Sequence, residues 1–266
     1  MKKRVFSAIV MVGLFIPFLL LGGLPFEIFM TALAVVGLYE LINIKEMNRK
    51  FPLITKIFAY LMVIFVVISN IDNLDFNLNL DYRLMAFLIF AFLTPMVFIN
   101  DNKKYNLDDA LYLVASVLFV GLSFNLLVVT RNYELNYIIY LLLITTITDT
   151  FALFTGMLVG KHKLAPEISP KKTIEGAVGG SLMGTFVASA FYVTVINSSI
   201  SLVLVIFITL LLSIIGQLGD LIFSSIKRYY GKKDFSDLIP GHGGILDRFD
   251  SLIFVALAFV ILIGII

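Results

Sequence analysis

Long apolar segments alternate with short polar segments along the whole chain. A membrane-spanning helix needs about 20 mostly apolar residues, and nine segments meet this requirement. They are residues 5–24, 26–44, 54–71, 84–99, 110–130, 135–159, 174–196, 200–226 and 249–266. The pattern therefore predicts an all-α polytopic membrane protein with about nine transmembrane helices.

The composition supports this prediction. Of the 266 residues, 60% are hydrophobic and 14% are charged, and the mean hydropathy is +1.01. These values lie far from those of soluble domains. The chain has no cysteine, which excludes a disulfide framework and a metal site built on thiolates.

The basic residues indicate which way the helices cross the membrane. Lys and Arg are retained on the cytoplasmic side of membrane proteins. Of the 20 basic residues, all except Arg83 and Arg131 lie at the N-terminus or in and beside 45–53, 100–109, 160–173 and 227–248. This distribution predicts a cytoplasmic N-terminus, four cytoplasmic loops and a C-terminus outside. The first segment resembles a signal peptide, but no convincing cleavage site follows it, so we expect an uncleaved helix.

Charged and polar residues within the apolar segments are concentrated in the second half of the chain. We therefore predict a transmembrane scaffold of about five helices in residues 1–134. Residues 135–266 would form a catalytic region of about four helices, with cytoplasmic loops 160–173 and 227–248.

Asp149 is an acid deep in a predicted span. It lies twelve residues before Lys161, roughly 18 Å along a helix that rises 1.5 Å per residue. A carboxylate at this depth is costly and usually marks a cavity, a pathway or a bound cation. The alternative is a structural aspartate that binds the neighbouring threonines, Thr145 and Thr148.

The next loop contains the sequence "SPKKTIEGAVGG". Ser169 is suited to a helix N-cap and Pro170 to the first helical position, so we expect a helix to begin here. Lys171 and Lys172 would lie in its first turn, where an anion such as phosphate would offset their charge. They could instead be ordinary cytoplasmic lysines. The glycines that follow, Gly176, Gly179 and Gly180, are typical of close helix packing.

The eighth segment carries a longer polar face. Its members recur at intervals of three or four residues: Ser213, Gln217, Asp220, Ser224, Lys227 and Arg228. Such a face cannot contact lipid and must line a polar interior. Asp220 would lie roughly 10 Å from Lys227 along this helix.

The segment "GHGGILDRFD" before the last span combines a glycine turn with two acids. Its backbone amides could approach a ligand, and Asp247 and Asp250 would share one side of the helix that follows. Basic residues surround these acids: Lys227, Arg228, Lys232, Lys233 and Arg248. Paired carboxylates in a basic environment suit phosphate chemistry with a divalent cation, usually Mg²⁺. His242 is more typical of a turn residue than of a general base.

Seventeen residues in this region resemble the signature of phosphatidate cytidylyltransferases, also called CDP-diacylglycerol synthases. They are Ser224, Ile226, Lys227, Arg228, Lys233, Asp234, Ser236, Ile239, Pro240, His242, Gly243, Gly244, Ile245, Asp247, Arg248, Phe249 and Asp250. "SPKKTIEG" and Asp149 resemble that family too. The resemblance covers residues 145–266, and it departs at Phe223, where many relatives carry glutamate.

The resemblance implies that CTP condenses with phosphatidic acid to give CDP-diacylglycerol and pyrophosphate. It implies that Asp220 and Asp247 hold Mg²⁺, with Asp250 in support and Asp149 as a further candidate. The implied phosphate and substrate contacts are Lys171, Lys172, Lys227, Arg228, Arg248, Ser169, Ser224, Lys233 and the turn His242, Gly243 and Gly244. A monovalent cation such as K⁺ and a homodimer are implied as well.

We expect the enzyme in a bacterial plasma membrane, with its site open to the cytoplasm and no nucleic-acid partner. Two alternatives remain at this point. A transporter also uses intramembrane carboxylates, but commonly has interrupted helices in two related halves. A CDP-alcohol phosphotransferase would carry a closely spaced "DG…AR…G…D…D" pattern, which this sequence lacks.

Overall fold

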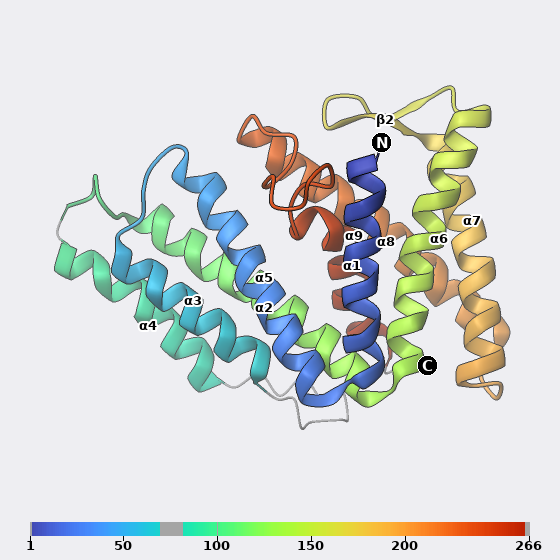
Figure 1. Cartoon of the computed structure of the whole chain (residues 1–266), viewed down its shortest axis with the longest axis horizontal. Coiled ribbons are helices and arrows are strands. Elements are labelled where there is room, and N and C mark those ends of the chain that lie inside the picture. Colours follow the sequence, from blue (N-terminus) through green and yellow to red (C-terminus); the bar gives the residue numbers. More distant parts are fainter. Residues whose placement is uncertain (1, 70–81, 100, 264–266) are drawn as a thin grey trace. The chain divides into compact units, whose positions relative to one another are not determined.

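The computed structural model describes residues 2–69, 82–99 and 101–263, and within these ranges the chain forms nine α-helices and one short β-hairpin (Figure 1). The chain divides into two compact units. The first consists of Met1–Asn132 together with Phe235–Leu246, and the second of Tyr133–Asp234 together with Asp247–Ile266. A twelve-residue segment late in the sequence therefore belongs with the N-terminal helices.

The first unit is a helical bundle. Its helices are α1 (Lys2–Leu21), α2 (Gly23–Glu46), α3 (Leu53–Ile68), α4 (Tyr82–Ile99) and α5 (Leu107–Tyr133). α2 packs on α1 and α3, and α3 packs on α4. Every fourth residue of α2 from Phe26 to Leu38 is buried, and this spacing gives the helix one continuous apolar face for its neighbours.

Within this unit, the side chain of Arg131 stabilises the end of α1. Gly22, between α1 and α2, has φ +64°, a conformation that suits glycine. The guanidinium of Arg131, on α5, donates to the carbonyl oxygens of Leu19 and Leu20 at the end of α1. A cation at a helix C-terminus offsets the partial negative charge of its carbonyl groups, so Arg131 has a structural role there.

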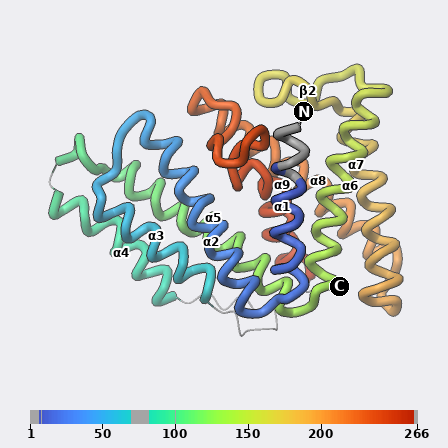
Figure 2. The backbone as a smooth tube through the Cα atoms, in the orientation of Figure 1, coloured from blue at the N-terminus to red at the C-terminus, as the bar shows by residue number. Residues whose placement is uncertain are grey.

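The second unit contains the remaining helices. They are α6 (Leu135–Val159), α7 (Ile174–Phe191), which a π-helical turn η1 (Tyr192–Ile196) extends, α8 (Leu202–Tyr229) and α9 (Leu246–Leu262). Only the first residue of α9 belongs to the first unit. The hairpin of β1 (Lys163–Ala165) and β2 (Ser169–Thr173) connects α6 to α7 (Figure 2).

Glycines on α7 allow close packing against α6, as the sequence predicted. A Cβ atom on Gly180 would lie 2.5 Å from the carbonyl oxygen of Thr148, and one on Gly176 would lie 2.6 Å from that of Ala152. A Cβ on Gly179 or Gly184 would also clash with threonine side chains of α6. Small residues are what permit two helices to approach this closely in a membrane.

The prediction that a helix begins at Ser169 is wrong. Residues Ser169–Thr173 form β2, which pairs antiparallel with β1, and α7 begins at Ile174. Thr173 is the N-cap, because its hydroxyl accepts a hydrogen bond from the amide of Gly176 (3.1 Å). A two-stranded hairpin tolerates Pro170, since each strand is an edge strand.

The predicted spans agree with the described helices to within a few residues, and those at 135–159 and 174–196 have the predicted limits. Of the described helices, six are long and apolar enough to cross a membrane: α2, α4, α5, α6, α7 with η1, and α8. The apolar part of α1 (Ile9–Leu21) and the helix α3 are shorter, and α9 has 17 residues. Residues 70–71 and 264–266 of the predicted spans lie outside the described residues.

Candidate functional site

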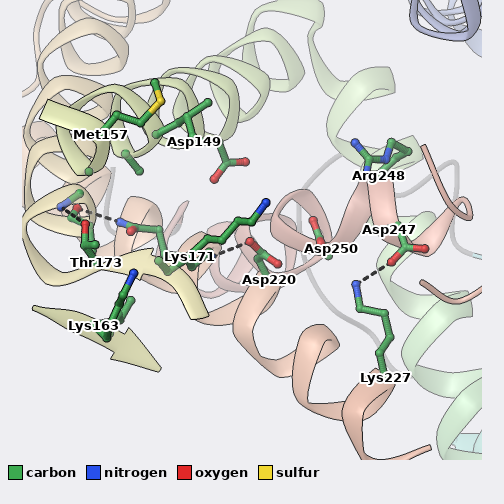
Figure 3. A pocket seen from close by; sticks show the side chains of 18 of the residues that line it. Asp149, Met157, Lys163, Lys171, Thr173, Asp220, Lys227, Asp247, Arg248 and Asp250 are labelled. Carbon is green, nitrogen blue, oxygen red and sulfur yellow. Dashed lines mark hydrogen bonds and ion pairs between the residues drawn. The ribbon is translucent and has the colours of Figure 1, made fainter. Parts of the chain in front are cut away.

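A cavity of about 760 Å³ lies in the second unit (Figure 3). Its walls come from the second half of α6, both strands of the hairpin, the start of α7, the second half of α8 and the start of α9. This volume is typical of sites for small molecules.

The cavity is lined by equal numbers of acidic and basic side chains. The five acids are Asp149, Asp220, Asp234, Asp247 and Asp250. The five cationic residues are Lys163, Lys171, Lys172, Lys227 and Arg248. Eight of these ten were predicted from separate motifs as metal, catalytic or phosphate contacts. They lie on α6, the hairpin, α8 and α9, and the structure places them around one cavity.

Two ion pairs join lysines to the acids that were predicted to bind metal. Lys172 Nζ lies 2.6 Å from Asp220 Oδ2, and Lys227 Nζ lies 2.6 Å from Asp247 Oδ1. The first pair is about a quarter exposed, whereas the side chains of the second are 8% and 2% exposed. The Lys227–Asp247 pair is therefore the buried one, and removing either partner would leave a charge without its counterion.

Asp149 and Asp250 belong to the same electrostatic group. Asp250 interacts with Asp220 and with Asp149, and its carboxylate lies between those of Asp220 and Asp247 in Figure 3. Asp149 interacts with Lys172 and Arg248 as well. Asp149 thus lines a cavity within the apolar segment. Thr148, which was the alternative partner of its carboxylate, contacts Ser213, with 2.8 Å between the two hydroxyl oxygens.

The hairpin contributes three lysines to the lining of the cavity. Lys171 and Lys172 project from β2 and not from a helix turn, and Lys163 lies on β1, where it pairs with Thr173. Lys163 was not among the predicted site residues, because the sequence did not predict a hairpin. An antiparallel pairing of the two strands would have placed it beside the other lysines.

Several predicted substrate contacts are not among the residues lining this cavity. Arg228 donates to the carbonyl oxygens of Ile168 (3.3 Å) and Lys232 (2.8 Å), so it ties the hairpin to the end of α8. Ser224 donates to Asp220 Oδ1 at 3.3 Å and so supports that carboxylate. Ser169 and Lys233 belong to the second unit but are not among the lining residues.

His242, Gly243 and Gly244 belong to the first unit. The hydroxyl of Ser7 donates to the carbonyl oxygen of Pro240 (3.0 Å) and lies 2.7 Å from Nδ1 of His242. The amides of Ile245 and Leu246, which follow this turn, donate to the carboxylate of Glu40 on α2. Glu40 was not predicted from the sequence, because its partners lie 196 to 206 positions away in the chain.

Phe223, where many relatives carry glutamate, is fully buried. Its ring lies edge-on against that of Phe254, with 6.1 Å between the centroids. This position of α8 therefore faces the packed interior between α8 and α9.

The oxygen donors in the cavity fit Mg²⁺, which prefers carboxylates, water and substrate phosphates. Across the described residues, no three acidic or histidine side chains lie close enough to enclose a metal. Mg²⁺ is usually held by one or two carboxylates together with substrate phosphates, and Asp220 and Asp247 are the two acids that the sequence predicted for it.

The fold and the site define a class: a polytopic helical membrane protein with a cavity lined by acidic and basic side chains. The model of the Cytidylyltransferase family matches residues 2–266. Phosphatidate cytidylyltransferases of Staphylococcus haemolyticus and Staphylococcus saprophyticus are each 38% identical over 255 residues, and that of Staphylococcus aureus is 38% identical over 256 residues. Each alignment covers 96% of both chains.

The chain therefore belongs to the cytidylyltransferase family, as its signature predicted. The match also corrects the extent of the resemblance. It is not limited to residues 145–266 but includes the N-terminal helices.

Proposed function

We propose that this chain is a phosphatidate cytidylyltransferase, which condenses CTP with phosphatidic acid to CDP-diacylglycerol and pyrophosphate. The observation that carries the proposal is the cavity lined by five acids and five cations, in a chain 38% identical over nearly its full length to three enzymes of that name.

The reaction needs positioning and charge neutralisation more than proton transfer. A phosphate oxygen of phosphatidate attacks the α-phosphorus of CTP. The bond from that phosphorus to the oxygen bridging to the β-phosphate breaks, and pyrophosphate leaves with the electron pair. The lipid phosphate is already an anionic nucleophile, so the site has to hold two anions in line and reduce their repulsion.

The lining cations are placed for that task. Lys163 and Lys171 are exposed to the cavity and approach it from the hairpin, and Arg248 approaches from the first turn of α9. Lys172 and Lys227 form ion pairs with Asp220 and Asp247 before any substrate binds. We assign the phosphates of CTP and phosphatidate to these side chains. Ser169, Ser224, Arg228, Lys233 and the turn His242–Gly244 keep their proposed substrate roles on the family resemblance alone.

The charge balance of the cavity supports a requirement for Mg²⁺. Its acids and cations are equal in number, so the protein alone supplies no excess positive charge for a triphosphate and a phosphate monoester. Asp220 and Asp247 would hold the ion together with substrate phosphates. Asp250 would support them, and Asp149 stays the further candidate that the family resemblance implies. When bound, the ion would neutralise phosphate oxygens and polarise the α-phosphorus. The expected K⁺ ion and homodimer rest on the family resemblance.

The proposed setting is a bacterial plasma membrane with the cavity open to the cytoplasm, where CTP is made. The relatives are bacterial, and the basic residues of the hairpin and of 227–248 support this orientation.

The proposal is tested by adding CTP and phosphatidate in detergent micelles to the purified protein with Mg²⁺. We expect pyrophosphate and CDP-diacylglycerol in equal amounts. Absence of both products from protein that elutes as a single species in gel filtration would contradict the proposed activity.

A further inference from the structure

Glu40 is a buried carboxylate of the first unit that the reaction scheme does not use. It lies on α2, six residues before the end of a helix long enough to span the membrane, and its side chain is fully buried. A carboxylate in such surroundings is costly unless hydrogen bonds or charges compensate for its lost hydration.

Three donors from one segment compensate for it. The hydroxyl of Ser236 donates to Oε1 (2.7 Å), the amide of Ile245 also donates to Oε1 (2.8 Å), and the amide of Leu246 donates to Oε2 (2.9 Å). These donors lie at the two ends of the segment Phe235–Leu246, all of which belongs to the first unit. One carboxylate therefore joins the beginning and the end of this segment.

Gly244 shows how closely the segment approaches Glu40. A Cβ atom at this position would clash with the carboxylate. Within the segment, Ile239 and Gly243 form a bridge, and the positive φ angles of Gly241 (79°) and Gly243 (81°) make the turn possible. The glycines of "GHGG" are thus explained by a turn that brings two amides onto Glu40.

The amides of Ile245 and Leu246, which donate to Glu40, lie at the start of α9, because Leu246 is the first residue of that helix. Amides at a helix N-terminus have no partner within the helix and carry partial positive charge. A carboxylate supplied by α2 therefore acts as the cap of α9. The next residue in the chain is Asp247, whose carboxylate lines the cavity.

We propose that Glu40 is a positioning residue for the reaction: its carboxylate fixes the first turn of α9 and so fixes the backbone from which Asp247 projects. Glu40 itself touches none of the reacting groups. This inference rests on the proposed function, since it assigns Glu40 a part in that same reaction.

The test compares Glu40→Gln with Glu46→Gln as a matched control. Glu46 is the same residue type on the same helix, and its carboxylate also accepts a backbone amide, that of Phe51 (3.0 Å). Glutamine retains one acceptor oxygen but presents an NH₂ group where Glu40 has its second oxygen. One amide at the start of α9 would then lose its acceptor.

For Glu40→Gln we expect kcat to fall at least about tenfold, which corresponds to about 1.4 kcal/mol in the barrier. The KM for CTP should stay within about twofold, because the lost contact positions a reacting group and binds no substrate. Hydrogen exchange should accelerate in peptides covering 235–250 and in no others. Ser236→Ala, which leaves both amides on Glu40, should lower kcat by less than about threefold.

Equal kcat values for Glu40→Gln and Glu46→Gln would overturn the inference, as would unchanged exchange in peptides 235–250. If Glu40→Gln does not assemble, Gly244→Ala decides. It keeps the charge but displaces the carboxylate, and Gly13→Ala is its control because a Cβ there meets nothing within 4 Å. Wild-type protein without turnover would instead contradict the proposed function, and hydrogen exchange would still test the contact.

Discussion

At the scale of single residues, the Lys227–Asp247 ion pair is the most constrained feature of the cavity. Both side chains are almost fully buried, and their charged atoms are 2.6 Å apart. Breaking such a pair by removing one partner typically costs about 3–5 kcal/mol, because the remaining charge is left buried. In the proposed reaction, Asp247 would also contact a metal ion.

The pair can be tested by separating stability from activity. Lys227→Met should lower the midpoint of thermal unfolding in detergent, and adding Asp247→Asn should restore most of the loss because no uncompensated charge remains. Neither variant should form CDP-diacylglycerol. Lys104→Met is the control, since Lys104 belongs to an exposed pair with Asp101. If the losses of the two substitutions add instead of cancelling, the two charges do not depend on each other for stability.

Lys171 differs from its neighbour because it is exposed to the cavity, whereas Lys172 is paired with Asp220. A charge-assisted contact to phosphate is worth about 1.5–3 kcal/mol. Lys171→Gln should therefore lower kcat/KM for CTP or phosphatidate by about 10- to 100-fold without a change in unfolding midpoint. A ratio within twofold of wild type would leave Lys171 as a topology signal only.

At the scale of elements, the contact between α6 and α7 holds the hairpin over the cavity. Gly184 is buried, and a Cβ there would clash with the hydroxyl of Thr148. Overpacking a close helix contact typically costs about 1–3 kcal/mol. Gly184→Val should therefore lower both the unfolding midpoint and the activity. Leu182→Val, at a position 61% exposed on the same helix, should change neither, and equal effects of the two substitutions would contradict this packing.

The helices could be predicted from the sequence because each apolar segment is long and is bounded by polar residues. The same local reading failed at residues 169–173. Ser169 and Pro170 carry a good N-cap signal, but the pairing with Lys163–Ala165 and the cap at Thr173 compete with it and prevail. Local propensity does not include the partner strand, so the hairpin and Lys163 were both missed.

Most charged residues of the cavity could be predicted because they share helix faces or motifs. Asp220 and Lys227 recur at helical spacing on α8, and Asp247 and Asp250 do so on α9. Glu40 could not be predicted in this way. Its three partners are 196, 205 and 206 positions away, and a single acid in an apolar segment carries no spacing that points to them.

At the scale of the whole molecule, the account requires that the hairpin and residues 227–248 face the cytoplasm. The chain has no cysteine, so single cysteines can report sidedness without background. Glu167→Cys and Lys233→Cys, both at exposed positions, should react with an impermeant maleimide only after the cells are opened. Ser198→Cys, which the predicted topology places outside, should react in intact cells. Labelling of position 233 in intact cells would contradict the predicted orientation of the chain in the membrane.

The cavity of the second unit is proposed to carry out Mg²⁺-dependent cytidylyl transfer. The most direct measurement is CDP-diacylglycerol formation by Asp220→Asn and Asp247→Asn across a Mg²⁺ titration, with Asp108→Asn, an acid in the first turn of α5, as the control. Asparagine keeps one oxygen ligand but removes the charge. We expect each cavity variant to lose at least about 99% of turnover, about 2.7 kcal/mol or more in the barrier, while it still elutes as folded protein. A folded variant that keeps more than about a tenth of wild-type activity, a barrier change below about 1.4 kcal/mol, with an unchanged Mg²⁺ response would contradict the claim.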